Sequence, residues 1–454
     1  MSLALCVSQG RPPVDAPHVP VAIVGAGACG LVTALALRDA GVPCVLLERD
    51  ARPTGSTALS SGFIPAPATQ IQRAAGVHDD SVALFARDIQ AKAHGSAAPH
   101  LVDAYAQAVG PALDTLSERH GITFEVLDGF LYPGHSVRRM HAVPEKTGAA
   151  LVVQLERAAL AAGADILTEA TVRVLWVDAA QRITGLRYER PDGRVEDLAC
   201  DVLVLACNGF GGNTAMVREL LPQMRDAPFA GHTGNDGSAI SWGRALGARL
   251  ADLGGYQGHG SWAVPHGTLI SWALMMEGAI QLNTEGERFH DETGGYSEAA
   301  VKVLAQPGGV AWNVFDDPLL ALARSFPDFR DAEAAGAVKT CADARALAAL
   351  IGADPAIVAA SCAGAPKRPL QAPLHAVKVT GALFHTQGGL DIDAHCRVLR
   401  EDGTPLPNLL AAGGAARGVS GNAVWGYLSG NGLLSAVAGG SIAAQAATQM
   451  LNTP

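Results

Sequence analysis

The chain has 454 residues, of which 49% are hydrophobic and 17% are charged, and its net charge is -10. This composition is typical of a compact globular protein, and the length exceeds what one hydrophobic core usually supports, so two domains are expected. The acidic balance, together with the lack of any basic cluster in the sequence, excludes a nucleic-acid-binding surface.

The cysteines and the ends of the sequence indicate the class of protein. The eight cysteines form no CxxC pair and no CxxCH, which favours reduced thiols in a cytoplasmic protein and excludes covalent haem; no metal site is expected. Residues 1–18 lack the pattern of a signal peptide and predict a short disordered lead. The apolar run 432–447 contains glycines and serines, so it predicts a buried helix and no membrane span.

A glycine turn lies between an apolar strand and an apolar helix near the start of the chain. Residues 21–30 read Val-Ala-Ile-Val-Gly-Ala-Gly-Ala-Cys-Gly, and the helix follows at 31–37. A second strand, 44–47, leads to Glu48, where an acid accepts hydrogen bonds from the ribose hydroxyls of an adenine nucleotide. The pattern predicts a dinucleotide site; the alternative is an ordinary α/β turn with an empty cleft.

Each glycine of the turn has a separate geometric task. Gly25 makes the tight bend, Gly27 lets the backbone approach a pyrophosphate, and Gly30 lets the helix pack closely on the strand. The phosphates then bind the free N–H groups at the helix N-terminus.

Further elements follow in chain order. The loop 54–62 is small and hydroxyl-rich, as expected of a segment that approaches a ligand closely. The patterns predict helices at 82–93, 99–120 and 148–161, and strands at 171–177, 183–190 and 195–199, with Asp192-Gly193 as a hairpin turn. The apolar run 202–207 predicts a buried parallel strand that returns to the first sheet.

The later sequence predicts a domain made from both ends of the chain. Strands at 376–383 and 409–412 and the final helix are expected to rejoin the first sheet. We therefore expect an α/β fold with a Rossmann-like FAD-binding domain, containing a parallel sheet, helices and a β-meander, and an inserted α+β cap. The expected boundaries are a lead at 1–18, the FAD-binding domain at 19–230 and 367–454, and the cap at 231–366. Because only one dinucleotide fingerprint occurs, bound FAD fits better than dissociating NAD.

Eight motifs in order resemble one flavoprotein family. They lie at 25–30, 55–62, 208–213, 232–237, 283–289, 385–393, 411–414 and 430–432. The chain, from about Val19 to Ala446, resembles the flavoproteins grouped with soluble fumarate reductase, the succinate dehydrogenase flavoprotein subunit and the 3-ketosteroid dehydrogenases.

The resemblance implies a set of FAD contacts. They are Gly25, Ala26, Gly27, Cys29, Gly30, Glu48, Arg49, Ser56, Thr57, Ser60, Ser61, Gly62, Val172, Ala206, Asn208, Gly209, Gly413, Gly414, Gly430, Asn431, Gly432, Leu433 and Leu434. Members that attach FAD covalently carry a histidine in the hydroxyl-rich loop, where this chain has Ser56 and Thr57, so FAD should be non-covalent. The usual acid of the late Ala-Gly motif is Gly414 here, so one ribityl contact is expected to differ.

The chain departs from fumarate reductases at the positions of their proton donor and proton relay. Tyr296 occupies the place of the donor arginine that follows the Arg288-Phe289 motif, and Trp272 and Met275 occupy the relay positions. Loop 418–432 contains no counterpart of the second carboxylate-binding arginine. A bis-carboxylate substrate is therefore not expected.

The site pattern is similar to that of the 3-ketosteroid dehydrogenases and related ketone desaturases. These enzymes have a tyrosine at the position of Tyr296 and a late tyrosine that resembles Tyr427. Two family histidines correspond to His259 and His385. The resemblance implies α,β-dehydrogenation of a ketone, in which an α proton leaves to a base and a β hydride goes to flavin N5.

Each candidate residue has an expected role. Tyr427, with a backbone N–H in 430–432, would polarise the carbonyl oxygen. Tyr296 would act as the base; a free tyrosine has a pKa of about 10, so it needs a positive neighbour or a helix dipole. Either His259 or Arg288 could supply that charge.

Structural roles are the alternative for every one of these residues. His385 would bind a second polar group, such as a carboxylate, or else cap a turn, and His259 has the same alternative. Arg288 could instead close the cap turn as an ion pair with Glu285. The tryptophans and methionines near Trp272 fit a cap core, and one aromatic ring could pack on an alicyclic substrate.

Three functions compete. The leading prediction is an FAD-dependent desaturase of a small cyclic ketone or keto acid that passes electrons to an unidentified external acceptor. The second is an enone or enoate reductase running in reverse, which would need a donor although the sequence has no haem, iron–sulfur or second nucleotide motif. The third is an FAD-fold binding or escort protein without redox chemistry. The sequence leaves the oligomeric state open.

Overall fold

The computed structural model describes residues 3–128 and 131–452. Its chain divides into two compact units. Unit 1 comprises Met1–Leu220, Gly231–Tyr256 and His385–Pro454, and unit 2 comprises Leu221–Ala230 and Gln257–Phe384. Unit 1 therefore draws on both ends of the sequence, as expected for the nucleotide-binding part.

The central sheet of unit 1 has the order β1-β8-β9-β10-β2-β3-β7, and β20 joins it between β10 and β19. The strands are β1 (Cys6–Gln9), β2 (His18–Val24), β3 (Cys44–Leu47), β7 (Asp165–Leu167), β8 (Thr171–Val177), β9 (Ile183–Glu189), β10 (Val195–Leu205), β19 (Arg397–Leu399) and β20 (Pro405–Ala411). β7, β3, β2, β10 and β20 pair in parallel, whereas β8, β9 and β10 form an antiparallel meander. The predicted parallel sheet and meander are thus confirmed.

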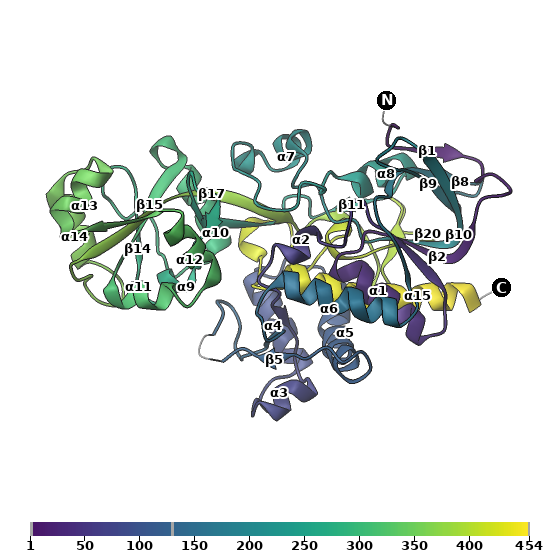
Figure 1. The fold of residues 1–454 in the computed structure, drawn as a ribbon, viewed down its shortest axis with the longest axis horizontal. Helices are drawn as coiled ribbons and strands as arrows, with labels where there is room; N and C mark the ends of the chain where they lie inside the picture. Colours follow the sequence, from purple (N-terminus) through teal and green to yellow (C-terminus); the bar gives the residue numbers. More distant parts are fainter. Residues whose placement is uncertain (1–2, 129–130, 453–454) are drawn as a thin grey trace. The chain divides into compact units, whose positions relative to one another are not determined.

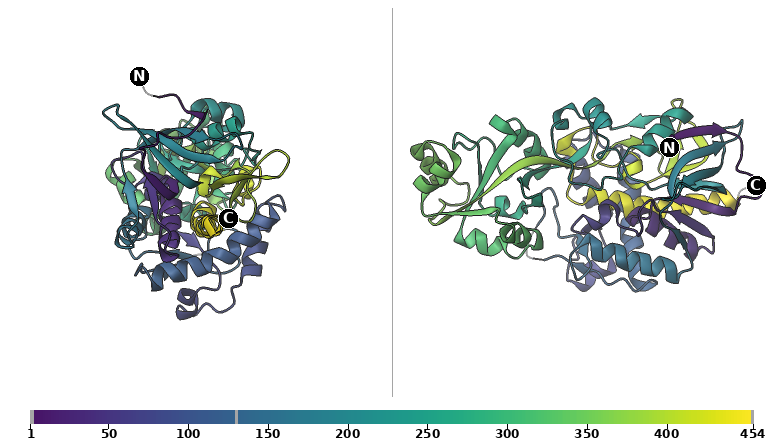
Figure 2. Two further views of the ribbon diagram at one scale, coloured as in Figure 1. Left: turned by 90° about the vertical axis from the view of Figure 1, so that its right-hand side faces the viewer. Right: turned by 45° about the horizontal axis from the view of Figure 1, so that its top comes forward.

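Unit 1 also contains helices. They are α1 (Ala28–Asp39), α2 (Gly55–Ala58), α3 (Gln70–Ala74), α4 (Val82–Lys92), α5 (Pro99–Glu118), α6 (Gly148–Ala161), α7 (Thr214–Leu220), α8 (Ser238–Leu246) and α15 (Asn431–Asn452). α1 packs against α15 and α6, and α5 packs on α15. Figure 2 shows α1 in purple beside α15 in yellow from two sides. The alanines and glycines of α15 are mostly buried and permit this close packing.

Short strands complete unit 1. β4 (Ile64–Pro65), β6 (Met140–Ala142) and β5 (Glu125–Val126) form a three-stranded sheet, and β11 (Leu250–Ala251) pairs with β18 (Gly389–Leu390). The 3-10 turns η3 (Gly413–Ala415) and η4 (Val424–Gly426) precede α15.

Unit 2 has its own sheet, with the order β13-β12-β17-β15-β14 and with β16 beside β17. Figure 1 labels β14, β15 and β17 of this sheet. Its strands are β12 (Tyr256–Ala263), β13 (Thr268–Leu269), β14 (Ile280–Leu282), β15 (Val310–Asp316), β16 (Val338–Cys341) and β17 (Leu374–Thr386). Its helices are α9 (Ala273–Met276), α10 (Tyr296–Leu304), α11 (Asp317–Ala323), α12 (Pro327–Ala334), α13 (Ala344–Ile351) and α14 (Pro355–Ala363), with 3-10 turns η1 (Pro222–Met224) and η2 (Pro307–Gly309). A separate hydrophobic core lies under this sheet.

Two expectations about the chain's organisation are corrected. The lead 1–18 is not wholly disordered, because residues 6–9 form β1, which pairs in parallel with the edge of β8. The strand expected at 376–383 belongs to the sheet of unit 2, where β17 pairs with β15 and β16. Because β17 belongs to that sheet, unit 2 extends past 366, and residues 231–256 pack with unit 1.

No helix within the described ranges combines the length and the apolar character needed to cross a membrane.

Candidate active site

The glycine turn after β2 has the geometry that its sequence predicts. Gly25 has φ of +104°, and a Cβ there would lie 2.6 Å from the carbonyl oxygen of Ala206. A Cβ on Gly30 would lie 1.9 Å from the oxygen of Gly25, so any side chain would push α1 away from the turn. At Gly27 the nearest atom to such a Cβ is Thr57 Oγ1 at 3.4 Å, so the protein itself leaves room there.

Glu48 directly follows β3, and its carboxylate binds the glycine turn. Its Oε2 accepts a hydrogen bond from the N–H of Ala26 at 2.9 Å, and its Oε1 accepts one from the N–H of Asp50 at 3.0 Å. The carboxyl group is buried, and desolvation raises its pKa. Each oxygen keeps acceptor capacity, as contact with ribose hydroxyls would require.

The hydroxyl-rich loop meets the N-terminus of α1. Thr57 Oγ1 accepts a hydrogen bond from the N–H of Ala28 at 3.1 Å, and Ser60 Oγ accepts one from Gly62 N–H at 3.1 Å. Ser61 is exposed. The first N–H groups of a helix have no partner within the helix, so the remaining ones here can bind an anion.

Ser56 joins this loop to the segment after β10. Its Oγ accepts hydrogen bonds from the amide nitrogens of Asn208 and Asn235, both at 2.9 Å. A Cβ on Gly414 would lie 2.1 Å from Asn208 Oδ1. The side chain of Asn208 therefore fills the space in which an acid at position 414 would begin, which explains the departure noted in the sequence.

Other expected cofactor residues lie around the turn. Arg49 donates from Nη1 to the oxygen of Gly234 at 3.0 Å and forms an ion pair with Asp236. Val172 is buried on β8, and Cys29 is buried in the first turn of α1. A Cβ added to Gly413 would lie 3.2 Å from the Cβ of Cys29. A Cβ added to Gly209 would collide with the side chain of Thr386.

The N-terminus of α15 carries unpartnered polar atoms. Among the described residues, Asn431 Oδ1 and Ser435 Oγ are buried without a hydrogen-bond partner. Gly430 has φ of +88°, and an added Cβ there would lie 2.6 Å from Pro65. Leu434 is buried and Leu433 is half-buried in the core that α15 helps to form.

These features fit a dinucleotide. Buried polar atoms in proteins are almost always hydrogen-bonded, so unpartnered ones indicate a ligand or water. The room beside Gly27, the N–H groups of α1 and the orphaned oxygens of α15 match the acceptor and donor groups of FAD.

His385 and Tyr427 come together within unit 1. Their ring centroids lie 5.4 Å apart, edge to face. Gln387 donates from Nε2 to His385 Nδ1 at 3.0 Å. Desolvation lowers the pKa of His385 to about 4, so its imidazole is neutral near pH 7.

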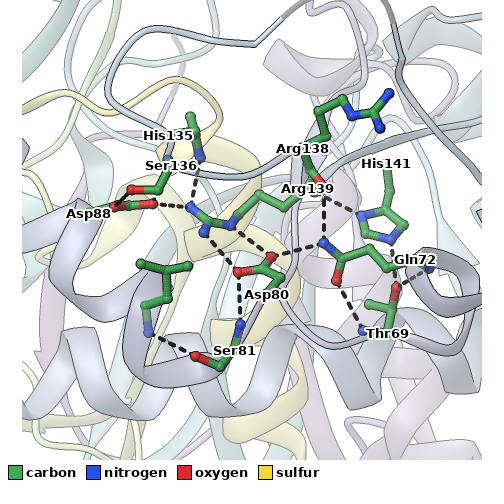
Figure 3. A network of polar contacts seen from close by, with 11 residues as sticks. Thr69, Gln72, Asp80, Ser81, Asp88, His135, Ser136, Arg138, Arg139 and His141 are labelled. Carbon is green, nitrogen blue, oxygen red and sulfur yellow. Dashed lines mark hydrogen bonds and ion pairs between the residues drawn. The ribbon is translucent and has the colours of Figure 1, made fainter. Parts of the chain in front are cut away.

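A buried charge network supports the loop that carries Tyr427. Figure 3 shows Arg139 between Asp80, at 2.8 Å, and Asp88, with His135 beside it. Because Arg139 can only donate, His135 Nδ1 accepts its N–H, and Nε2 donates to the oxygen of Ser429 at 2.9 Å. Ser429 precedes the expected glycine loop, so the network fixes the entry to α15.

Unit 2 places Tyr296 against His259. Tyr296 is the first residue of α10, and its ring stacks on His259 with centroids 4.9 Å apart and an interplanar angle of 21°. Trp272 and Phe384 contact the same imidazole at 5.8 Å and 5.7 Å. Ser261 N–H donates to His259 Nδ1 at 3.1 Å, so the neutral ring carries its proton on Nε2.

The expected source of positive charge is corrected. Desolvation lowers the pKa of His259 to about 3, so this histidine is neutral near pH 7. Arg288 directs its Nε to Glu292 at 3.0 Å and its Nη1 to the oxygen of Gly364 at 2.6 Å; Glu292, and not Glu285, is its ion-pair partner. Tyr296 itself lies at the N-terminus of α10, the positive end of the helix dipole.

The fumarate reductase positions carry packing residues. Trp272 donates from Nε1 to the oxygen of Gly294 at 3.0 Å, and Met275 is buried in the core of unit 2. Arg417, directly before loop 418–432, is held by Asp252 at 2.6 Å and Asp391 at 3.3 Å. That arginine is already neutralised by two carboxylates.

Sequence reasoning missed four supporting residues: His135, Arg139, Gln387 and Ser420. His385 is near Gln387 in the sequence, and His135 is near Arg139, but the other partners of these residues are distant: Ser420 binds Gln387, Ser429 binds His135, and Asp80 and Asp88 bind Arg139. No local pattern indicates these distant contacts.

Comparison with known proteins places the chain in a family. The family model described as "FAD binding domain" matches residues 20–433. The curated NADH:fumarate oxidoreductase of Klebsiella pneumoniae (strain 342) is 26% identical over 92% of this chain, and the chain spans 47% of that relative's length. The probable fumarate reductase Ifc3 of Shewanella frigidimarina (strain NCIMB 400) is 27% identical over 93% of the chain and 74% of its own. The 4-oxocyclohex-2-ene-1-carboxylate 5-dehydrogenase of Sinomonas cyclohexanicum is 23% identical over 90% of both.

Solved structures show the same fold. The open conformation of a flavocytochrome c3 fumarate reductase superimposes with a TM-score of 0.82 at 25% identity, covering 96% of this chain and 78% of that one. The 3-ketosteroid delta1-dehydrogenase from Sterolibacterium denitrificans gives a TM-score of 0.79 at 20% identity, covering 95% and 99%. The chain belongs to the FAD binding domain family, its curated relatives include fumarate reductases, and its fold is also that of a 3-ketosteroid delta1-dehydrogenase.

Proposed function

We propose that this protein catalyses α,β-dehydrogenation of a ketone, and that the substrate is a small cyclic ketone or keto acid. The observation that carries the proposal is Tyr296, which lies at the N-terminus of α10 and stacks on the neutral ring of His259. The residue at this position is a tyrosine, where the resemblance places the proton-donating arginine of the fumarate reductases. A tyrosine at a positive helix end suits proton removal, because the dipole stabilises the phenolate.

Different residues of the chain carry out the separate steps of this reaction. Tyr427 and an N–H of 430–432 hydrogen-bond to the ketone oxygen as enolate charge develops. Tyr296 takes the α proton. When bound, FAD supplies the acceptor for the β hydride. One proton and one hydride leave, the C=C bond forms, and the two electrons pass to an external acceptor.

The relatives support both directions of this chemistry. The Sinomonas dehydrogenase is named for a cyclic keto acid, which supports oxidation of such a ring. The two fumarate reductase relatives support the alternative, an enone or enoate reductase that uses reduced FAD. The structure favours oxidation because Trp272 and Met275 stand where the resemblance places the proton relay, and Arg417 is already paired.

Two further properties belong to the proposal. FAD is held non-covalently, because Ser56 and Thr57 provide only hydroxyls in the loop. The protein works in a reducing compartment such as the cytoplasm, a setting that its eight free cysteines suit.

Product analysis tests the function. Purified protein should be yellow, release FAD on acid precipitation, and convert cyclohexanones to enones in the presence of an artificial electron acceptor. Enone formation with a 4-carboxylate but not without it would identify a keto acid substrate. A protein without flavin absorbance would instead support the binding or escort function. A flavoprotein that reduces enoates and forms no enone would establish the reductase.

A further inference from the structure

A chain of buried hydrogen bonds within unit 1 runs from α15 to His385. Asn431 Nδ2 donates to Ser420 Oγ at 3.0 Å, and Ser420 Oγ donates to Gln387 Oε1 at 2.8 Å. Gln387 Nε2 then donates to His385 Nδ1 at 3.0 Å. Every donor along this path points toward the histidine.

The direction of the chain determines where the imidazole carries its proton. With its Oε1 occupied by Ser420, Gln387 turns its NH₂ group to His385, and an NH₂ group can only donate. Nδ1 therefore accepts from Gln387 at 3.0 Å, its nearer partner, because the other polar atom beside it, Thr386 O, lies farther away at 3.4 Å. Since His385 is neutral near pH 7, its one proton lies on Nε2.

The members of the chain are held in place. Gln387, Ser420 and Asn431 are 4%, 1% and 0% exposed. The backbone of Gln387 is bound on both sides, by Gly255 O and by the N–H of Gly418, each at 2.8 Å. Such a side chain cannot rotate without leaving a buried amide unpaired, which costs about 1–3 kcal/mol.

The other edge of the imidazole is available. A Cβ on Gly432 would lie 2.9 Å from Nε2, so the glycine permits this edge to approach the start of α15. Among the described residues, the polar partners of His385 are Gln387 Nε2 and Thr386 O, and both lie beside Nδ1 and not Nε2. The ring of Tyr427 contacts the imidazole edge to face.

We propose that Gln387 is a positioning residue that fixes the tautomer of His385, so that Nε2–H donates to an oxygen of the substrate. Ser420 and Asn431 fix the orientation of Gln387. A donor at this edge selects a carbonyl or carboxylate oxygen. The substrate contact rests on the proposed function, whereas the tautomer does not.

The reversed network is the competing arrangement. Turning both amides around would put the proton on Nδ1 and make Nε2 an acceptor, which would repel a carboxylate or carbonyl oxygen. The two arrangements give opposite protonation of the same two nitrogens.

Nitrogen NMR of the flavin-loaded protein distinguishes them. With ¹⁵N-histidine labelling, and with the resonances assigned by their loss in His385→Asn, we expect Nε2 protonated and Nδ1 unprotonated at pH 7. In Gln387→Glu a carboxylate can only accept, so Nδ1 should become protonated and the titration of His385 should move upward by more than about one pH unit. Tyr427 is the ionisable ring in contact with His385.

Controls separate this role from a structural one. Gln387→Leu removes the donor and should give a mixture of tautomers, whereas Gln70→Glu, an exposed glutamine on α3, should leave the His385 resonances unchanged. For an accepted keto acid, Gln387→Leu should raise KM about tenfold with little change in kcat. Nδ1–H in the parent protein, or tautomers unaffected by Gln387→Glu, would overturn the proposal; a normal tautomer without ketone turnover would count against the proposed function alone.

Discussion

Units 1 and 2 build their parts of the chemistry in different ways. In unit 1 the backbone determines the cofactor site, since Gly25, Gly30 and Gly430 stand where any Cβ would collide with a neighbouring atom. In unit 2 the candidate base is positioned by rings packed around His259. A glycine pattern therefore identifies the cofactor, whereas the reaction depends on side chains whose neighbours come from distant segments.

The substitution Tyr296→Phe should distinguish the role of unit 2 in the reaction from the role of unit 1 in FAD binding most clearly. Loss of the base should lower flavin reduction by ketone by about 10²–10⁴-fold, while FAD, bound by unit 1, stays at full occupancy. Stopped-flow absorbance measures both. Tyr188→Phe is the matched control, because that tyrosine donates to Glu196 within the meander; a Tyr296→Phe rate equal to the control's would show that unit 2 has another base.

Arg139→Met should lower the free energy of unfolding of unit 1. It leaves Asp80 and Asp88 without their buried cation, and breaking a buried pair in this way costs about 3–5 kcal/mol. Urea denaturation measures the free energy of unfolding. Arg194→Met removes an exposed ion pair with Asp192 and serves as the comparison, with an expected change below about 1 kcal/mol. Equal effects of the two substitutions would mean that the network does not hold unit 1 together.

Alanine substitutions at two glycines of unit 1 should have different effects, one on stability and the other on FAD binding. Gly30→Ala places its Cβ 1.9 Å from Gly25 O, so it should lower stability by about 1–3 kcal/mol even without FAD. Gly27→Ala meets only Thr57 Oγ1 at 3.4 Å, so it should fold normally and bind FAD more weakly. Thermal melts and flavin titrations of both proteins check this. A Gly27→Ala protein with unaltered FAD affinity would show that the pyrophosphate does not bind at that turn.

Mild acid should weaken both units. Desolvation lowers the pKa of His135, His141 and His385 in unit 1 to about 4 and that of His259 in unit 2 to about 3. An unfolded histidine titrates near 6.5, so the unfolded chain binds more protons between that value and the folded pKa. Stability is complete above pH 6.5 and falls as the pH drops, by at most about 1.4 kcal/mol per pH unit for each histidine. Hydrogen exchange at pH 7 and pH 5, expressed as protection relative to the intrinsic exchange rate at each pH, measures this. Unchanged protection in unit 1 would mean that its histidines are not buried as neutral groups.

Most of the fold could be predicted where the pattern is local. The helix at 148–161 has its predicted bounds, and Gly193 turns the expected hairpin between β9 and β10. β1 was missed because four residues, three half-buried and one exposed, give no strand signal without their partner β8. β17 was assigned to the wrong sheet because the sequence of a buried apolar strand has the same pattern in the sheet of unit 1 and in the sheet of unit 2.

The candidate site follows the same division. The roles of Gly25 and Gly30 could be interpreted from the sequence, because they belong to one short glycine motif. An added Cβ on Gly30 would meet Gly25 in the same turn, and one on Gly25 would meet Ala206 directly after the neighbouring strand β10. The roles of Gln387 and His135 could not, because their partners Ser420 and Ser429 reach them only in the folded chain.

Anaerobic mixing tests the central claim most directly. Oxidised protein is mixed with cyclohexanones, with and without a 4-carboxylate, and the photoreduced protein is mixed with fumarate, while flavin absorbance is recorded. A cyclic ketone should bleach the flavin within seconds, and fumarate should leave the reduced flavin unchanged. Rapid reoxidation by fumarate with no bleaching by any ketone would contradict the assignment as a ketone desaturase.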